Sequence, residues 1–213
     1  MKKSLILFVL FSGITSTTFF SCKNNQNKEE SSAQEQNDSS VVYPADEAVY
    51  GHLGEGTGMS CLEFITNQGD TLELNKTDES TGKDGIILGE IANYTDQYAL
   101  VTSQDSQSVA IALNVNQLMR SWQSSSNSSK GMHLIINGDI KPINEKDSCQ
   151  YNKWELYNCK LVLLNIPKES NRPIKSDTID IISLTLDSMT VQYAHSQNKE
   201  TFYPVNPNKH GKR

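Results

Sequence analysis

Short runs of apolar and β-branched residues, separated by turn-forming residues, dominate this chain from Val49 onward and constrain its fold more than any other feature. Helical periodicity, with apolar residues three and four positions apart, is almost absent. Evenly spaced short strands with turns between them are typical of a β-sandwich or a β-barrel. The sequence therefore predicts an all-β fold.

In the first half, residues 59–66 lead through Asn67-Gln68-Gly69 into residues 70–75, where Leu72 and Leu74 alternate with polar neighbours. This pattern predicts a half-buried hairpin. Further strands are expected at 86–91, 97–102 and 108–115. The glycine-rich run 51–58 precedes a strand and not a helix, so we interpret it as a bulged strand or a loop and not as a phosphate-binding loop.

The second half repeats the β pattern. Residues 131–136 run into Asn137-Gly138, a dipeptide that favours a tight hairpin because both residues tolerate positive φ. Strands are expected at 153–156, 160–164, 178–184, 189–194 and 201–205. Residues 116–122 could form a helical turn, and the serine-rich residues 123–129 have the composition of a loop or linker.

The N-terminus has the features of a secretory signal. Two lysines precede an apolar stretch at 5–11, which is too short to span a bilayer, and the segment ends at Ser21-Cys22 in a motif that resembles a lipobox. We expect cleavage before Cys22 and lipidation of that cysteine, although an ordinary signal peptide with an incidental cysteine is the alternative. Residues 23–40 contain few apolar side chains and predict a flexible tether.

These features divide the chain into five predicted parts. They are a lipoprotein signal peptide (1–21), a tether (22–46), an N-terminal β-module (47–118), a second β-module (119–206) and a polar tail (207–213). About 160 residues follow the tether, which is enough for one medium domain or two small ones.

The net charge and the cysteine content limit the classes of partner and cofactor that the protein can bind. The formal charge is −6 and becomes −8 once Lys2 and Lys3 are removed with the signal, which argues against a nucleic-acid partner. Cys149 and Cys159 could form a disulfide outside the inner membrane, or, together with Cys61, they could all remain thiols. No Cys-x-x-Cys or histidine pair suggests a metal, and we expect no cofactor.

A larger pattern in the second half covers roughly residues 119–206. It comprises Gly131-x-x-Leu134-x-x-x-Gly138, Tyr151-x-x-Trp154, Ser176-Asp177-Thr178, Leu184-Thr185-x-Asp187 and Tyr203. This pattern resembles a lipocalin-like domain found in lipoproteins of Bacteroides-type gut anaerobes, and the first half looks like the β-module that accompanies such domains. The resemblance implies two small antiparallel β-barrel-like modules at the cell envelope, with no catalytic residues to assign.

Few residues suggest a catalytic or ligand-binding role. Tyr151 and Trp154 could form an aromatic wall for a ligand or fill the core. Asp177 and Asp187 could be a glycosidase-type pair, although each stands beside hydroxyl residues that favour local backbone contacts. No common hydrolase, zinc-protease or nucleotide-binding motif is present.

We therefore expect a non-enzymatic lipoprotein, anchored to a membrane through Cys22, that binds a small ligand or a partner protein of the envelope. The outer membrane is the expected location, and the face that carries the anchor is left open. The alternatives are an assembly accessory of an outer-membrane complex and a hydrolase.

Overall fold

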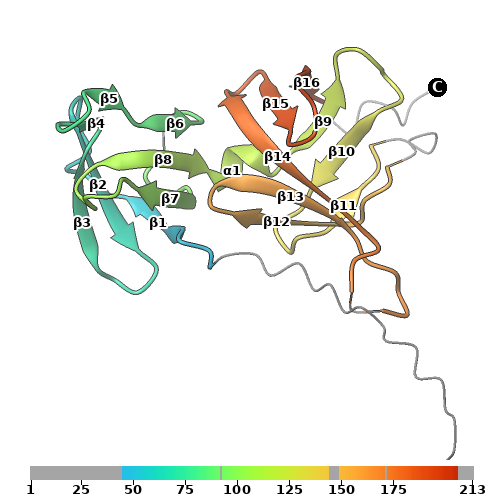
Figure 1. Ribbon diagram of the computed structural model, residues 1–213, viewed down its shortest axis with the longest axis horizontal. Coiled ribbons are helices and arrows are strands. Elements are labelled where there is room, and N and C mark those ends of the chain that lie inside the picture. The colour runs from blue at the N-terminus through green and yellow to red at the C-terminus, as the bar shows by residue number, and fades with distance from the viewer. Residues whose placement is uncertain (1–44, 92, 144–148, 171, 206–213) are drawn as a thin grey trace, which may run out of the picture. The chain divides into compact units, whose positions relative to one another are not determined.

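The computed structural model describes residues 45–205, except 92, 144–148 and 171 (Figure 1). The predicted signal peptide, Cys22, nearly all of the tether and the C-terminal tail lie outside the described residues. In the described part of the chain, nearly all of the regular secondary structure is strand, so the predicted all-β fold is confirmed.

The first half forms a six-stranded sheet in the order β3-β2-β1-β7-β8-β6. Every pairing in it is antiparallel except that of β6 with β8, so this module departs from the purely antiparallel arrangement that we expected. A small separate sheet joins β4 to β5. The bounds are β1 Val49–Leu53, β2 Cys61–Thr66, β3 Thr71–Asn75, β4 Thr77–Asp78, β5 Lys83–Asp84, β6 Ile86–Leu88, β7 Tyr98–Thr102 and β8 Val109–Asn114.

The central strands of this sheet are apolar on both faces. In β7, Tyr98 and Leu100 belong to one core cluster together with Phe64 of β2, whereas Ala99 and Val101 pack into a second cluster. Successive side chains of a strand point to opposite faces, so a continuous apolar run such as residues 98–101 indicates a strand covered on both sides. The second cluster is shared with the C-terminal half of the chain.

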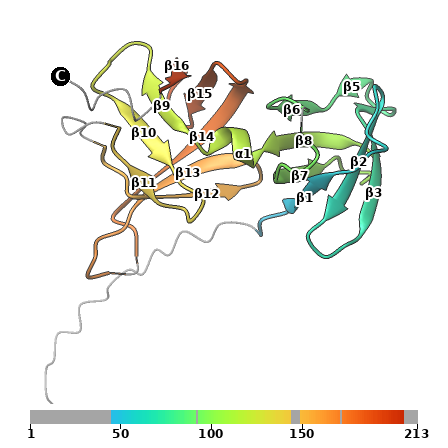
Figure 2. The same ribbon diagram turned by 180° about the vertical axis from the view of Figure 1, so that it is seen from behind.

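The second half begins with a short helix and continues as an eight-stranded antiparallel sheet, shown from two sides in Figures 1 and 2. Consecutive strands pair, and β16 returns to pair with β9, which makes an up-and-down arrangement. The bounds are α1 Val115–Leu118, β9 Ser121–Ser124, β10 Gly131–Leu134, β11 Ile140–Lys141, β12 Lys153–Tyr157, β13 Lys160–Asn165, β14 Lys175–Leu184, β15 Met189–Tyr193 and β16 Lys199–Pro204.

The remaining edges of this sheet, β11 and β12, meet and nearly close it into a barrel. Asp139 pairs with Lys153, the Trp154 backbone N–H donates to the Gly138 carbonyl oxygen at 2.7 Å, and the Ile140 N–H donates to the Asn152 carbonyl oxygen at 2.9 Å. Gly138 has a φ of +79°, as the Asn-Gly dipeptide favours, whereas Asn137 does not have a positive φ. Closure matters because an unpaired strand edge is open to association with other chains.

The N-terminal sheet packs against one end of this barrel. At that end, the Cys159 thiol donates to the Ala99 carbonyl oxygen at 3.4 Å, and the Gly89 N–H donates to the Leu184 carbonyl oxygen at 2.9 Å. Cys159 and Asn158 form the β12–β13 turn, where both have positive φ values of 61° and 48°. The turn thus places a buried cysteine in the core that the two halves share.

The expected strands of the second half are confirmed, with ends that differ by up to three residues. Two strands of the second half were not predicted, namely β9 and β11. The prediction of a loop or linker at residues 123–129 is wrong at its start, because Gln123 and Ser124 belong to β9 and pair with β10 and β16. The cause is not local: polar residues can occupy a strand when neighbouring strands, here including the distant β16, supply the hydrogen bonds.

Candidate functional site

A cavity of about 320 Å³ lies inside the barrel. It is bordered by the β9–β10 loop, the segment before β12 and the inner faces of several strands. Because strands alternate in direction, this loop and this segment lie at the end of the barrel opposite to the β12–β13 turn. The described residues that line it are Asn127, Ser129, Lys130, Gly131, Met132, Ile140, Cys149, Gln150, Tyr151, Leu163, Tyr193 and Phe202.

The apolar part of the cavity wall comes from strands on several sides of the barrel. Met132, Ile140, Leu163 and Phe202 all line it, and each is buried. The register explains their convergence, because alternate residues of a barrel strand face the interior. These side chains give the cavity an apolar wall that holds water poorly and suits hydrocarbon groups.

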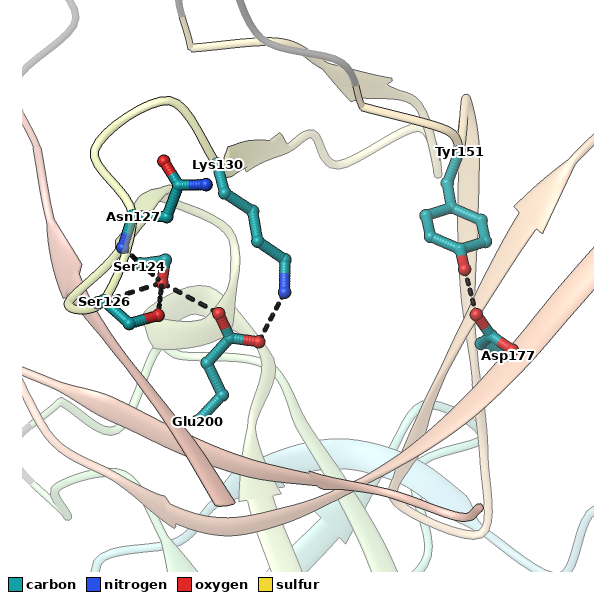
Figure 3. Close-up of polar contacts among 7 residues, drawn as sticks. All are labelled: Ser124, Ser126, Asn127, Lys130, Tyr151, Asp177 and Glu200. Atoms are coloured by element: carbon teal, nitrogen blue, oxygen red, sulfur yellow. Dashed lines mark hydrogen bonds and ion pairs between the residues drawn. The ribbon is translucent and has the colours of Figure 1, made fainter. Parts of the chain in front are cut away.

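A first polar group lies at the entrance, on the side formed by β16 and the β9–β10 loop. Lys130 Nζ contacts Glu200 Oε2 at 2.6 Å, and Ser124 Oγ donates to Glu200 Oε1 at 2.8 Å (Figure 3). The ammonium group also lies over the ring of Tyr193, 5.4 Å from its centroid. Both oxygens of Glu200 therefore have partners, and the Lys130 ammonium is held between a carboxylate and an aromatic face.

A second polar group lies across from the first (Figure 3). The Tyr151 hydroxyl donates to Asp177, and the Lys175 ammonium lies over the Tyr151 ring, 5.0 Å from its centroid. Lys175 Nζ also donates to Gln150 Oε1 at 2.6 Å and lies 3.8 Å from Asp177 Oδ2. The two groups have the same composition, namely a lysine, a tyrosine and a carboxylate.

The electrostatic state of these groups follows from burial and charge. Burial and the hydrogen bond to Asp177 raise the pKa of Tyr151, and burial raises the pKa of Tyr193, so both phenols stay neutral. For Lys130, burial lowers the pKa but the hydrogen bond and charge of Glu200 outweigh it, and the net shift is upward. Lys130 is therefore a cation at neutral pH.

Tyr151 and Trp154, the two aromatic residues considered as a ligand wall, lie in different environments in the structure. Tyr151 lines the cavity. Trp154 lies in the core cluster, with its indole N–H donating to the Ile135 carbonyl oxygen at 2.9 Å. Tyr151 thus takes the position expected of a ligand contact, and Trp154 the position expected of a core residue.

Cys149 and Cys159 are not joined by a disulfide in the structure. Cys159 is buried in the core shared with the N-terminal sheet, and its burial raises the pKa of its thiol to about 12. Cys149 instead lines the cavity, and its thiol donates to the Tyr151 carbonyl oxygen at 3.3 Å. The two cysteines stand at opposite ends of β12, which is why a disulfide does not form.

The two aspartates considered as a catalytic pair do not converge. Asp177 lies near the start of β14, on the inner face of the barrel, whereas Asp187 follows the other end of that strand in the turn before β15. Ten residues of extended chain span roughly 30 Å, several times the separation that a glycosidase pair requires. The Asp187 N–H instead contacts the Thr185 hydroxyl within the turn.

The described residues hold neither a metal site nor a membrane-spanning helix. In that part of the chain no group of three or more histidine, cysteine or acidic side chains is arranged to hold a metal ion. Nor does any helix there have the length and apolarity needed to cross a membrane.

Sequence reasoning missed Lys130, Lys175 and Glu200. A signal was present for Glu200, because it precedes the buried Phe202 by two positions and so shares its inward face once the strand is recognised. Lys175 and Asp177 likewise share the inward face with Ile179. The inward position of a charged residue is visible in a sequence only when the register of the strand is known.

Eight antiparallel strands that follow one another around an internal cavity define the up-and-down β-barrel class. Residues 114–203 match the family model described as lipocalin-like, so this segment is similar to that family. The resemblance predicted for residues 119–206 is thereby confirmed, while the Bacteroides-type lipoprotein stays a prediction. Neither the curated proteins nor the solved structures gave a match to the chain.

Proposed function

We propose that the lipocalin-like domain binds one small, mainly apolar molecule inside its barrel. The observation that carries the proposal is the cavity of about 320 Å³, which has an apolar wall and a polar entrance. A barrel of eight strands is just wide enough to enclose one small ligand, and pockets from about 300 Å³ upward accommodate such molecules.

The arrangement of the wall favours an amphipathic ligand. Burying apolar ligand surface against Met132, Leu163 and Phe202 contributes about 25 cal/mol for each Å² removed from water. The Lys130 and Tyr151 side chains at the entrance can hydrogen bond a polar group at the other end of the ligand. A fully polar ligand would leave the apolar wall without a partner.

Thermal unfolding with a panel of apolar compounds that carry one polar group tests this proposal. At 100 times the dissociation constant, a ligand adds about 2.7 kcal/mol and raises the midpoint by roughly 5–10 °C. Leu163→Trp fills part of the cavity and is expected to weaken binding about tenfold or more. Ile182→Trp is the matched control, because Ile182 is exposed on the same hairpin.

A panel in which no compound moves the midpoint would contradict ligand binding. Equal loss of binding in Leu163→Trp and Ile182→Trp would place the ligand elsewhere. Mass spectrometry of the protein purified under native conditions gives an independent check, because a retained small molecule should disappear from the Leu163→Trp variant and remain in the control.

We also propose that the chain is a non-enzymatic lipoprotein of the cell envelope, attached to a membrane by lipid on Cys22. The support is the charged and apolar N-terminus, the lipobox-like Ser21-Cys22 and the polar segment that follows. The separation of Asp177 from Asp187 supports the non-enzymatic role. Cys22→Ala should release the protein from the membrane fraction or leave it unprocessed, and a processed variant that stays attached would refute the anchor.

A further inference from the structure

The polar residues at the cavity entrance form an inner layer of the barrel. Glu200 stands opposite Val191 in the register of β15 and β16, and Asp177 stands opposite Leu163 in that of β13 and β14. Val191 and Leu163 are buried in the barrel core, so both carboxylates occupy inward-facing positions. Buried or half-buried carboxylates inside a barrel require cations or hydrogen-bond donors, and the entrance supplies both.

The positive charge of each lysine is already compensated. Lys130 contacts Glu200 at 2.6 Å, and the side chain of Glu200 is only 14% exposed. Lys175 lies 3.8 Å from Asp177, whose second partner is the Tyr151 hydroxyl. The four charged residues, Lys130, Glu200, Lys175 and Asp177, therefore sum to zero.

The hydrogen-bonding groups that face the cavity are of two kinds. Lys130 has three N–H donors, of which one is directed to Glu200, so it can donate to a ligand. Tyr151 directs its hydroxyl hydrogen to Asp177, which leaves the phenol oxygen as an acceptor. A hydroxyl or amide group can accept from Lys130 or donate to Tyr151. A carboxylate can only accept hydrogen bonds. It would compete with Glu200 for Lys130, and the negative charge of Glu200 would repel it.

We propose that the cavity selects an apolar ligand whose polar end is uncharged, an alcohol or an amide, and that Glu200 is the residue that excludes a carboxylate end. This inference rests on the proposed ligand-binding function and names the class of its ligand. Glu200 acts by neutralising the positive charge of the lysine that would otherwise attract the anion.

Calorimetric titration with decanol and decanoate tests the proposal, because the two compounds share an alkyl chain and differ in the charge of the polar end. The experiment uses residues 23–213 at neutral pH, which retains every described element. We expect decanol to bind about tenfold more tightly than decanoate, since a hydrogen bond to a charged group and a like-charge contact each change binding by about that factor.

Glu200→Gln keeps the size of the side chain and its contact with Ser124, but leaves the Lys130 cation without its carboxylate. The preference for decanol is expected to fall about tenfold or more, through tighter binding of decanoate. Asp180→Asn is the matched control. It removes the same charge from an exposed carboxylate that pairs with Lys160, and it should leave the preference unchanged.

Wild-type protein that binds decanoate as tightly as decanol would overturn the inference while leaving ligand binding intact. An equal change of preference in Glu200→Gln and Asp180→Asn would also overturn it, because net charge alone would then explain the effect. If neither compound binds and the wider panel also fails, the proposed function is refuted and the inference with it.

Lys130→Met provides a second variant if Glu200→Gln does not fold. It leaves the Glu200 carboxylate without its cation, so decanoate should bind even more weakly, whereas decanol keeps its contacts with the apolar wall. Tighter binding of decanoate to Lys130→Met would contradict the role of Glu200.

Discussion

Phe64→Ala tests whether the N-terminal sheet and the barrel unfold together. Phe64 lies on β2, is fully buried, and belongs to the core cluster on the face of the sheet that points away from the barrel. Both tryptophans of the chain, Trp122 and Trp154, lie in the barrel. A substitution at Phe64 therefore alters only the first module, and tryptophan fluorescence reports only on the second.

The size of the effect follows from burial. Truncation of a buried phenylalanine to alanine costs about 3–5 kcal/mol. With roughly 160 residues unfolding together, the entropy of unfolding is about 0.34 kcal/mol per degree, so the midpoint should fall by about 9–15 °C. The two halves share one core cluster, which includes Ala99 and Leu113 from the sheet and Leu161 from the barrel, and this shared core is the reason to expect a single transition.

Thermal unfolding followed by tryptophan fluorescence and by far-ultraviolet circular dichroism gives the result. We expect the two signals to coincide in wild-type protein and to shift together in Phe64→Ala. Tyr94→Ala removes an exposed aromatic ring from the same module, and it should shift the midpoint by only about 1–2 °C. A fluorescence midpoint that stays at its wild-type value in Phe64→Ala would refute the reasoning, because the barrel would then be independent of the sheet.

Two further predictions concern buried ionisable groups. A thiol reagent at pH 8 should label Cys159 in native protein far more slowly than the half-buried Cys61, because burial raises the pKa of Cys159 to about 12. Mass spectrometry measures the two labelling rates, and equal rates would contradict the prediction. Burial also raises the pKa of Tyr50 and of Tyr98 to about 12, so the folded protein keeps protons that the unfolded chain loses above the ordinary tyrosine pKa of about 10. The urea midpoint should therefore fall between about pH 10 and pH 12, and a flat or rising profile would show that these groups titrate alike in both states.

Much of the fold could be predicted because its signals are local. Alternating apolar residues mark the hairpin of β2 and β3, and Asn137-Gly138 marks the β10–β11 turn. The missed strands show the limit. The β9 strand, Ser121–Ser124, is polar except for Trp122, and its hydrogen bonds come from β10 and from β16 near the other end of the domain. Such a strand is specified by partners distant in the sequence, which local patterns do not reveal.

The candidate site was less predictable because its residues come from separate strands. Tyr151 was identified from its spacing to Trp154, but its partner Asp177 lies 26 positions further along the chain. Lys130 and Glu200 are 70 positions apart. A charged residue near a loop is usually solvated, so each of these residues has an unremarkable local context. Only the pairing register of the barrel strands brings these four residues together at the cavity entrance.

The joint between the two halves also bears on how a ligand enters. Contacts of the N-terminal sheet with Cys159 and Leu184 lie at the end of the barrel that carries the β12–β13 and β14–β15 turns. Lys130 and Tyr151 lie at the other end, where the cavity has its polar layer. Because the first end is packed with shared core residues, the proposed ligand is expected to exchange through the second end, past the Lys130–Glu200 pair. The same pair therefore stands where the polar end of a bound ligand would rest and where a ligand must pass to reach the apolar wall.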